Sequence, residues 1–162
     1  MLNGQPGRSV WAGPFGAAAA VLALGLYGVL QAVDGVALKH AVDAWATAPA
    51  AERAARFASA ETIRWLEWSV RSYHSFVLGV SFLLFGAVVT RTAVVPRPVG
   101  YLMGLSGLAY VTQGWVVGSE GFSAANAMPT RLGIVLVVSW SGWLLVIAWR
   151  RRAEESLTRS TV

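Results

Sequence analysis

The sequence of 162 residues contains no cysteine and few charged residues. The absence of cysteine excludes disulfide bonds, thiolate metal ligands and cysteine nucleophiles, and it removes the usual clue to the redox compartment. Charged residues make up 13% of the chain, whereas a soluble domain typically carries about 25%. Because so few charges cannot cover a water-facing surface, the composition favours a lipid-facing protein.

The chain also lacks the short motifs of common catalytic and nucleotide-binding sites. It has no Gly-x-Ser-x-Gly, no Walker motif and no Gly-x-Gly-x-x-Gly. Its two histidines, His40 and His74, do not stand at a zinc-binding helix spacing, and His40 lies outside any apolar stretch that could hold a haem. We therefore expect no metal site and no bound cofactor.

Long apolar stretches are what the chain has instead, and 56% of its residues are hydrophobic. A transmembrane helix needs about 20 mostly apolar residues. The stretches that meet this need are about residues 12–33, 72–90, 99–118 and 132–149. The sequence therefore predicts an all-α fold, a four-transmembrane-helix bundle that makes residues 1–162 a single integral membrane domain. Residues 119–130, with their turn-forming composition, are expected to be a loop.

The long connection between the first two stretches, residues 34–71, is predicted to form an amphipathic helical cap outside the membrane. Residues 34–48 separate polar from apolar side chains around a helix, which is typical of a helix lying at the membrane interface. Pro49 should end that helix, and the alanine-rich sequence after it has high helix propensity. We expect the new helix to continue into the second span without a break.

The arginines predict the orientation of the protein in the membrane. Four spans place both termini on one side, and the short flanks on that side carry Arg8, Arg91, Arg97, Arg150, Arg151, Arg152 and Arg159. Basic residues on the other side are spread along the cap and mixed with acids. Clustered arginines in short flanks mark the cytoplasmic side. We therefore expect cytoplasmic termini in the inner (plasma) membrane, and we interpret the net charge of +5 as an orientation signal rather than a nucleic-acid site.

Glycines recur on one face of the third stretch. They are Gly100, Gly104, Gly107, Gly114 and Gly118. Lipid provides no hydrophobic drive between helices, so the close approach of small residues must supply the contact. The face could pack against a second copy of the chain or against another span of the same chain. We prefer the internal contact, because a four-helix bundle has to pack somewhere.

A cluster of ionisable residues precedes the second stretch. Arg64, Glu67, Arg71 and His74 follow one another at spacings of 3, 4 and 3, which places them on one face of a helix at the membrane edge. Ionisable groups that reach membrane depth usually face the bundle interior or a water-filled cavity. The cluster is therefore a candidate ligand site, although ion pairing among its members is the simpler interpretation.

Five further residues join this candidate site. Asp34, Gln113 and Glu120 lie near span ends that the topology places on the same outer side. Trp140 and Trp143 lie near the middle of the fourth stretch. A tryptophan at that depth could line an apolar pocket, but it more often fills a bundle core.

Two classes of function fit these features. The first is a non-enzymatic membrane protein, either an accessory subunit or a binder of a small apolar ligand or lipid at the outer end of the bundle. Its partners would be membrane lipid and either a second copy or another membrane protein. The second is a membrane-embedded enzyme in which Glu67 and His74 act as acid and base while Arg64 and Arg71 hold an anionic group. We take the first as the main hypothesis.

Three segments carry a general resemblance to known proteins. They run from Asp34 to His40, from Arg64 to Trp68 and from Gln113 to Ser123. Together they resemble small four-span bacterial integral membrane proteins of uncharacterised function, over about residues 12–150. The resemblance implies a multi-span helical fold and brings no activity with it.

Overall fold

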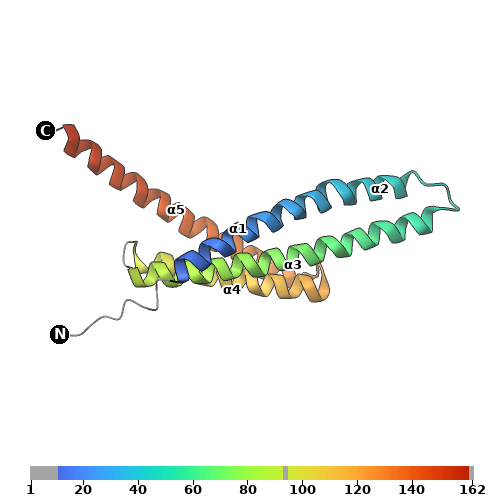
Figure 1. The fold of residues 1–162 in the computed structure, drawn as a ribbon, viewed down its shortest axis with the longest axis horizontal. Helices are drawn as coiled ribbons and strands as arrows, with labels where there is room; N and C mark the ends of the chain where they lie inside the picture. The colour runs from blue at the N-terminus through green and yellow to red at the C-terminus, as the bar shows by residue number, and fades with distance from the viewer. Residues whose placement is uncertain (1–10, 93–94, 161–162) are drawn as a thin grey trace.

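The computed structural model describes residues 11–92 and 95–160, with side chains as far as residue 153. All regular structure in these residues is helical, which confirms the predicted all-α fold. The elements are α1 (Ala12–Gln31), the π-helical segment η1 (Ala32–Leu38), α2 (Lys39–Ala46), α3 (Arg53–Thr92), α4 (Arg97–Glu120) and α5 (Ala124–Ser160), as Figure 1 shows.

A long helical hairpin extends beyond the other helices. α1, η1 and α2 form one continuous helix of 35 residues, and α3 has 40 residues. At 1.5 Å per residue α3 is about 60 Å long, roughly twice the thickness of the hydrocarbon core of a bilayer. Figure 1 shows α2 and the first turns of α3 reaching past the α4–α5 connection.

The cap is helical, and its first helix does not bend away from α1. It continues the axis of α1 through η1, because no proline interrupts the chain between Gln31 and Ala48. Pro49 then ends the helix as predicted, and its carbonyl accepts the amide of Glu52 at 3.0 Å in the turn that leads to α3. From Arg53 the helix runs unbroken to Thr92, which confirms the expectation of a single element.

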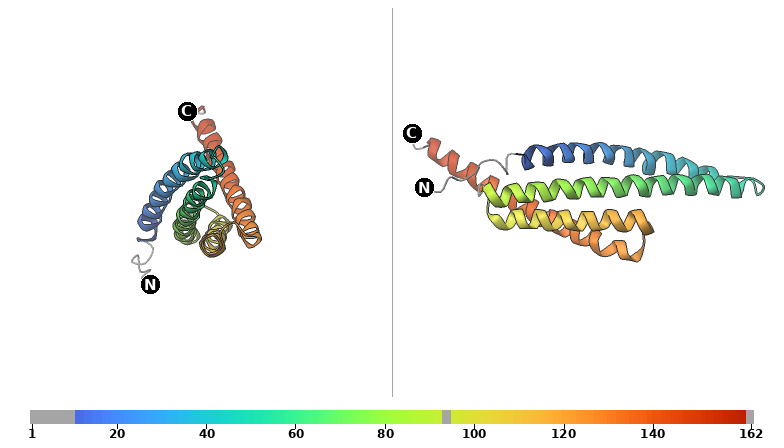
Figure 2. Two further views of the ribbon diagram at one scale, coloured as in Figure 1. Left: turned by 90° about the vertical axis from the view of Figure 1, so that its right-hand side faces the viewer. Right: turned by 60° about the horizontal axis from the view of Figure 1, so that its bottom comes forward.

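α3 is the central element of the fold. It packs against α1 on one side and against α4 on the other, and α5 packs on α4. Among the described residues, no backbone contact joins α1 to α4 or to α5. Figure 2 accordingly shows α3 between α1 and α4, so the helices stand in the order α1, α3, α4, α5.

The contact between α3 and α4 is made by glycines. A Cβ atom added to Gly107 would lie 2.6 Å from the carbonyl oxygen of Gly79, and one added to Gly86 would lie 2.7 Å from that of Gly100. Separations this short leave no room for a side chain, so the two backbones touch. Van der Waals contact between backbones is the attraction available to helices in lipid.

The rest of the predicted glycine face lies against the same helix. The Ser72 hydroxyl donates a hydrogen bond of 2.8 Å to the carbonyl of Gly114, and a Cβ on Gly118 would lie 2.7 Å from the Ser72 hydroxyl oxygen. Gly104 has open space around its own Cβ position, although its amide nitrogen is 2.8 Å from where a Cβ of Gly86 would lie. Within one chain, α3 therefore covers this face of α4.

The connection between α4 and α5 is much shorter than expected. The predicted loop over residues 119–130 is wrong, since α4 continues to Glu120 and α5 begins at Ala124. Pro129 lies inside α5 rather than before it. Gly121, with a φ of 67°, makes the turn possible by itself, because this backbone conformation favours glycine. Pro129 is tolerated because it forfeits only one backbone hydrogen bond near the start of the helix.

In the part of the chain that the structure describes, three helices are long and apolar enough to cross a membrane: Ala12–Ala46, Arg53–Thr92 and Ala124–Ala153. These include three of the four predicted spans. α4 has 24 residues, enough to span by length, but its glycines and Gln113 make it less apolar. Pro98 lies in its first turn, where a missing amide hydrogen is no loss.

Candidate functional site

Glu67 lies at the centre of the polar cluster and has no exposed surface. Its Oε2 accepts a hydrogen bond of 2.9 Å from Arg64 Nη1, and its Oε1 accepts one of 2.8 Å from Arg71 Nε. Both arginines belong to α3, at the spacings of three and four residues that bring side chains together on a helix. Because an unpaired buried carboxylate costs several kcal/mol, these two partners are what allows Glu67 to be buried.

Arg71 connects three parts of the fold. Its Nη2 lies 2.7 Å from Glu67 Oε1 and 3.6 Å from Oδ2 of Asp34, which belongs to η1. Its guanidinium carbon lies 5.0 Å from the centre of the Phe122 ring, in the connection between α4 and α5. A guanidinium over an aromatic face is attracted by the ring quadrupole. One side chain thus ties η1, α3 and the α4–α5 connection together at one level.

Phe122 and Gly121 also pack on Trp68. The rings of Trp68 and Phe122 meet edge to face at 6.3 Å, and a Cβ on Gly121 would lie 2.5 Å from the Trp68 ring. The Trp68 Nε1 atom is buried and has no hydrogen-bond partner among the described residues. Trp68 and Phe122 were not predicted as site residues, since only the turn at Gly121 brings them together.

The π-helical segment η1 sets the position of Asp34. π-Helical turns are rare and occur often at functional sites. η1 covers seven residues, Ala32–Leu38, and it lies where α1 leaves the predicted membrane region. Asp34 of this segment lies 3.6 Å from Arg71 Nη2, although the two residues are far apart in the sequence.

His74 shares the helix face of the cluster but contacts a different neighbour. Its ring packs against Tyr27 of α1, with centroids 5.6 Å apart and tilted by 44°. Within the described part of the chain it makes no ion pair with Glu67. His40 is exposed on α2. The acid and base of the enzyme hypothesis are therefore not paired.

The other predicted residues lie away from the cluster. Glu120 is exposed at the end of α4, Gln113 is half-buried in α4, and neither pairs with the cluster in the described residues. Trp140 lies between helices, where its Nε1 donates to the Ser106 hydroxyl at 3.1 Å. Trp143 is 41% exposed on α5. These four residues thus lie in separate places outside the cluster.

Trp140 belongs to an aromatic contact between three helices. The Phe82 ring of α3 meets Trp140 of α5 at 5.6 Å and Tyr110 of α4 at 5.7 Å, both edge to face. Aromatic pairs of this geometry contribute about 0.5–1.5 kcal/mol beyond their buried area. Trp140 therefore packs the fold in the structure of the single chain.

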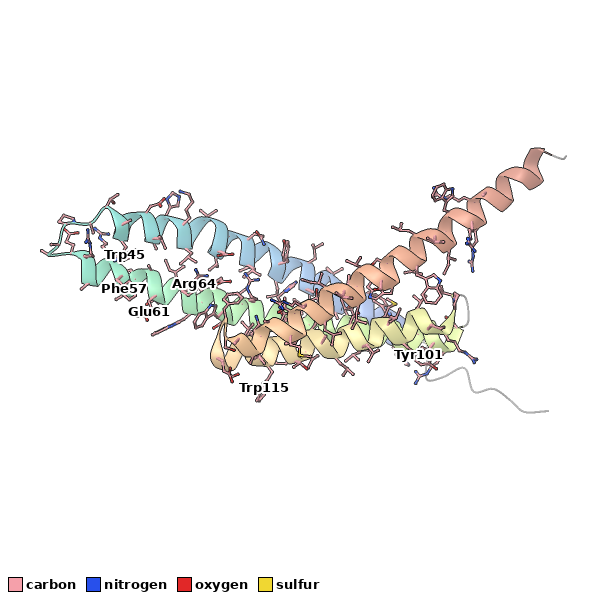
Figure 3. The ribbon with its side chains drawn as sticks, turned by 180° about the vertical axis from the view of Figure 1, so that it is seen from behind. Trp45, Phe57, Glu61, Arg64, Tyr101 and Trp115 are labelled. Atoms are coloured by element: carbon pink, nitrogen blue, oxygen red, sulfur yellow. The ribbon has the colours of Figure 1, made fainter. Side chains whose placement is uncertain are left out.

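Above the cluster, α2 and α3 enclose an open groove. Its volume is about 290 Å³, and its apolar lining includes Leu38, Val42, Trp45, Phe57, Trp65 and Trp68. The rings of Trp45 and Phe57 meet at 5.8 Å near the tip of the hairpin. Arg64 and Glu61 also line the groove, and Figure 3 shows Trp45, Phe57, Glu61 and Arg64 along the hairpin.

The two charged residues of the groove differ in their partners. Glu61 is exposed and has no ion-pair partner in the part of the chain that the structure describes. Arg64 pairs with Glu67, yet its side chain remains 42% exposed. The groove therefore offers an apolar surface with a carboxylate and part of a guanidinium at its edge.

A second groove, of about 410 Å³, lies between α1 and α3 and is lined by apolar residues that include Phe15, Leu22 and Val80. Its lining residues belong to the first two predicted spans. Because no charged side chain lines it, it has little means of selecting a ligand. The groove between α2 and α3 is the better candidate site.

Comparison with known proteins identifies the family. Neither the curated proteins nor the solved structures contain a match to this chain. The family described as Domain of unknown function (DUF4386) matches residues 6–148, which is most of the chain. The match takes in the hairpin, the polar cluster and the helices that pack below it. This protein therefore belongs to the DUF4386 family.

Proposed function

We propose that this protein is a non-enzymatic, four-span membrane protein that binds a partner subunit, or a small apolar ligand or lipid, at its outer end. Three of its helices are long and apolar enough to span a membrane. α4 packs between α3 and α5, which are two of those three. Because its neighbours on both sides would lie in the bilayer, α4 is the fourth span.

The orientation follows from the arginines and the aromatic residues. Arg91, Arg97 and Arg150–Arg152 belong to the ends of the helices that lie away from the hairpin, so we assign that end to the cytoplasm (Figure 1). Arg8 and the side chain of Arg159, which entered the prediction, lie outside the described residues. Exposed aromatic rings occur near this end at Trp11, Tyr101 and Trp149, as expected at headgroup depth. The inner membrane is the proposed location.

The groove between α2 and α3 is the observation that carries this proposal. Ligand sites are concave, mostly apolar and furnished with a few polar groups, with volumes of about 300–1,000 Å³. The groove fits this description at its lower limit, with 290 Å³, an aromatic lining, and Arg64 and Glu61 at its edge. The buried Nε1 of Trp68 adds a donor without a partner among the described residues.

The enzyme alternative has little support in the geometry. A general base must reach the proton that it removes, but Glu67 has no exposed surface and both of its oxygens already accept hydrogen bonds. His74 packs on Tyr27 instead of pairing with Glu67. Arg71 is shared by Glu67 and Asp34, so little positive charge remains to hold an anionic substrate. The cluster is better suited to fixing the hairpin on the bundle.

Native mass spectrometry of gently purified protein tests the proposal. We expect a bound protein or small molecule at a fixed stoichiometry. Phe57→Arg places a charge in the groove and should remove that species, whereas Ser59→Arg, on the opposite exposed face of α3, should retain it. Equal occupancy in the two variants would show that the groove is not the binding site.

A further inference from the structure

The face of α3 that packs against α4 continues past the end of α4. At Ser72 the two helices still touch, through its hydrogen bond to α4, and Gly121 then packs on Trp68 as the chain turns away. Trp68, Trp65 and Glu61 precede Ser72 by 4, 7 and 11 residues, a spacing that keeps them on the same face. The helix-packing surface of α3 thus extends beyond the end of α4, and among the described residues no helix continues α4 along it.

The space above α4 is the groove between α2 and α3. α2 bounds it through Leu38, Val42 and Trp45, and the α3 side runs from Phe57 to Trp68. Those 12 residues of α3 span about 16 Å, or roughly three helical turns. We infer that this groove receives an amphipathic α-helix from a partner protein on the outer side, in line with α4. The inference rests on the proposed binding function and specifies the partner.

The side chains around the groove define the chemistry of that helix. Trp65 is 55% exposed and Phe57 is 50% exposed, so they present apolar surface to a stripe of residues spaced three and four apart. Glu61 lies beside them and lacks an ion-pair partner in the described residues. The incoming helix therefore carries an apolar stripe flanked by a lysine or arginine that meets Glu61.

Lipid does not suit this position. Ser72 is the predicted start of the span, and Phe57 lies 15 residues before it, about 22 Å further along the helix. The headgroup layer is only about 5–8 Å deep on each side of the hydrocarbon core. An acyl chain would have to leave the bilayer to fill the groove.

A second copy of the chain does not suit it either. A second copy that docked through the same face of α3 would bring a helix that continues for some 20 residues along the predicted span. At that depth the corresponding position beside α3 is already taken by α4, which contacts α3 along its length. A helix that comes from the outer side and ends above Phe122 has no such conflict.

Photo-crosslinking in intact membranes tests the inference. p-Benzoylphenylalanine replaces Trp65 in the full-length protein, and a control carries it in place of Ser59 on the opposite face of α3. We expect one protein adduct from position 65 and none from position 59. Mass spectrometry should map the adduct to a helical segment with a basic residue. Glu61→Lys should lower the adduct by about tenfold or more, because like charges now meet.

Charge exchange completes the test. Replacing the partner's basic residue with glutamate should restore the adduct of the Glu61→Lys protein. We expect the Glu61→Lys protein to keep the melting temperature of the unmodified protein, which would show that it folds. A lipid adduct or an adduct to a second copy overturns the partner helix but leaves the proposed binding function standing. No adduct, together with equal occupancy in Phe57→Arg and Ser59→Arg, rejects both.

Discussion

Arg71 Nε donates a hydrogen bond of 2.8 Å to Oε1 of Glu67, a side chain with no solvent-exposed surface. The same guanidinium reaches Asp34 of η1 and lies over Phe122. The pair therefore does more than neutralise a buried charge on one helix. It fixes the long hairpin to the helices where α4 and α5 meet, and so it holds the groove between α2 and α3 in place relative to α4 and α5.

Glu67→Gln should destabilise the fold by about 3 kcal/mol, since it removes the negative charge that compensates the positive charges of Arg64 and Arg71. The value is at the lower end for such pairs because Arg64 is partly exposed. The measurement is thermal unfolding in detergent micelles. Glu61→Gln is the control, because Glu61 is exposed and exposed substitutions usually change stability by less than about 0.5 kcal/mol. Similar melting temperatures for the two variants would contradict a stabilising role for the cluster.

Gly107→Ala should separate α3 from α4. The added Cβ would lie 2.6 Å from the Gly79 carbonyl oxygen, so the helices must move apart, at about 1–3 kcal/mol. Gly107→Leu should prevent assembly of the fold. Gly25→Ala is the matched control, since nothing lies within 4 Å of that Cβ position, and alanine favours a helix by about 1 kcal/mol over glycine. Size-exclusion chromatography and melting in detergent report both effects, and a Gly107→Ala protein as stable as Gly25→Ala would disprove the close contact.

Much of the fold could be predicted because local signals agree with it. The apolar stretches indicate membrane helices, and Pro49 marks the one place where the first long helix must end. The α4–α5 connection could not be predicted in this way. In the sequence, Pro129 predicts the start of a helix. In the structure, Gly121 packs on Trp68 and the chain turns eight residues before Pro129, so the proline lies inside α5.

The candidate site shows the same division between local and distant contacts. Arg64, Glu67 and Arg71 belong to one helix, so their spacing alone indicates that they meet. Asp34 joins them from the π-helical segment η1 on another long helix. Phe122 joins them through the α4–α5 turn, which no periodic pattern in the sequence predicts. Contacts within a helix follow from its period, whereas contacts between helices depend on turns and packing that the sequence does not encode locally.

Trp140→Phe should lower stability by about 0.5–1.5 kcal/mol, the usual contribution of one hydrogen bond, because it removes the bond from Trp140 Nε1 to Ser106. Trp143→Phe should have little effect, since Trp143 is exposed on α5. A double-mutant cycle with Ser106→Ala isolates the interaction. Free energies that simply add in the cycle would show that the two side chains do not interact in the membrane protein.

Gly121→Ala should loosen the α4–α5 connection without unfolding the spans. Alanine is strained at a φ of 67°, and its Cβ would lie 2.5 Å from the Trp68 ring, so we expect a loss of about 1–3 kcal/mol. As Phe122 shifts, the Arg71 guanidinium loses its aromatic contact. Hydrogen exchange should then rise in η1 and in the middle of α3, while α1 and the lower part of α4 stay protected. Gly142→Ala, with open space at its Cβ position, provides the control. Increased exchange spread evenly over all helices would mean that the connection does not act through Arg71.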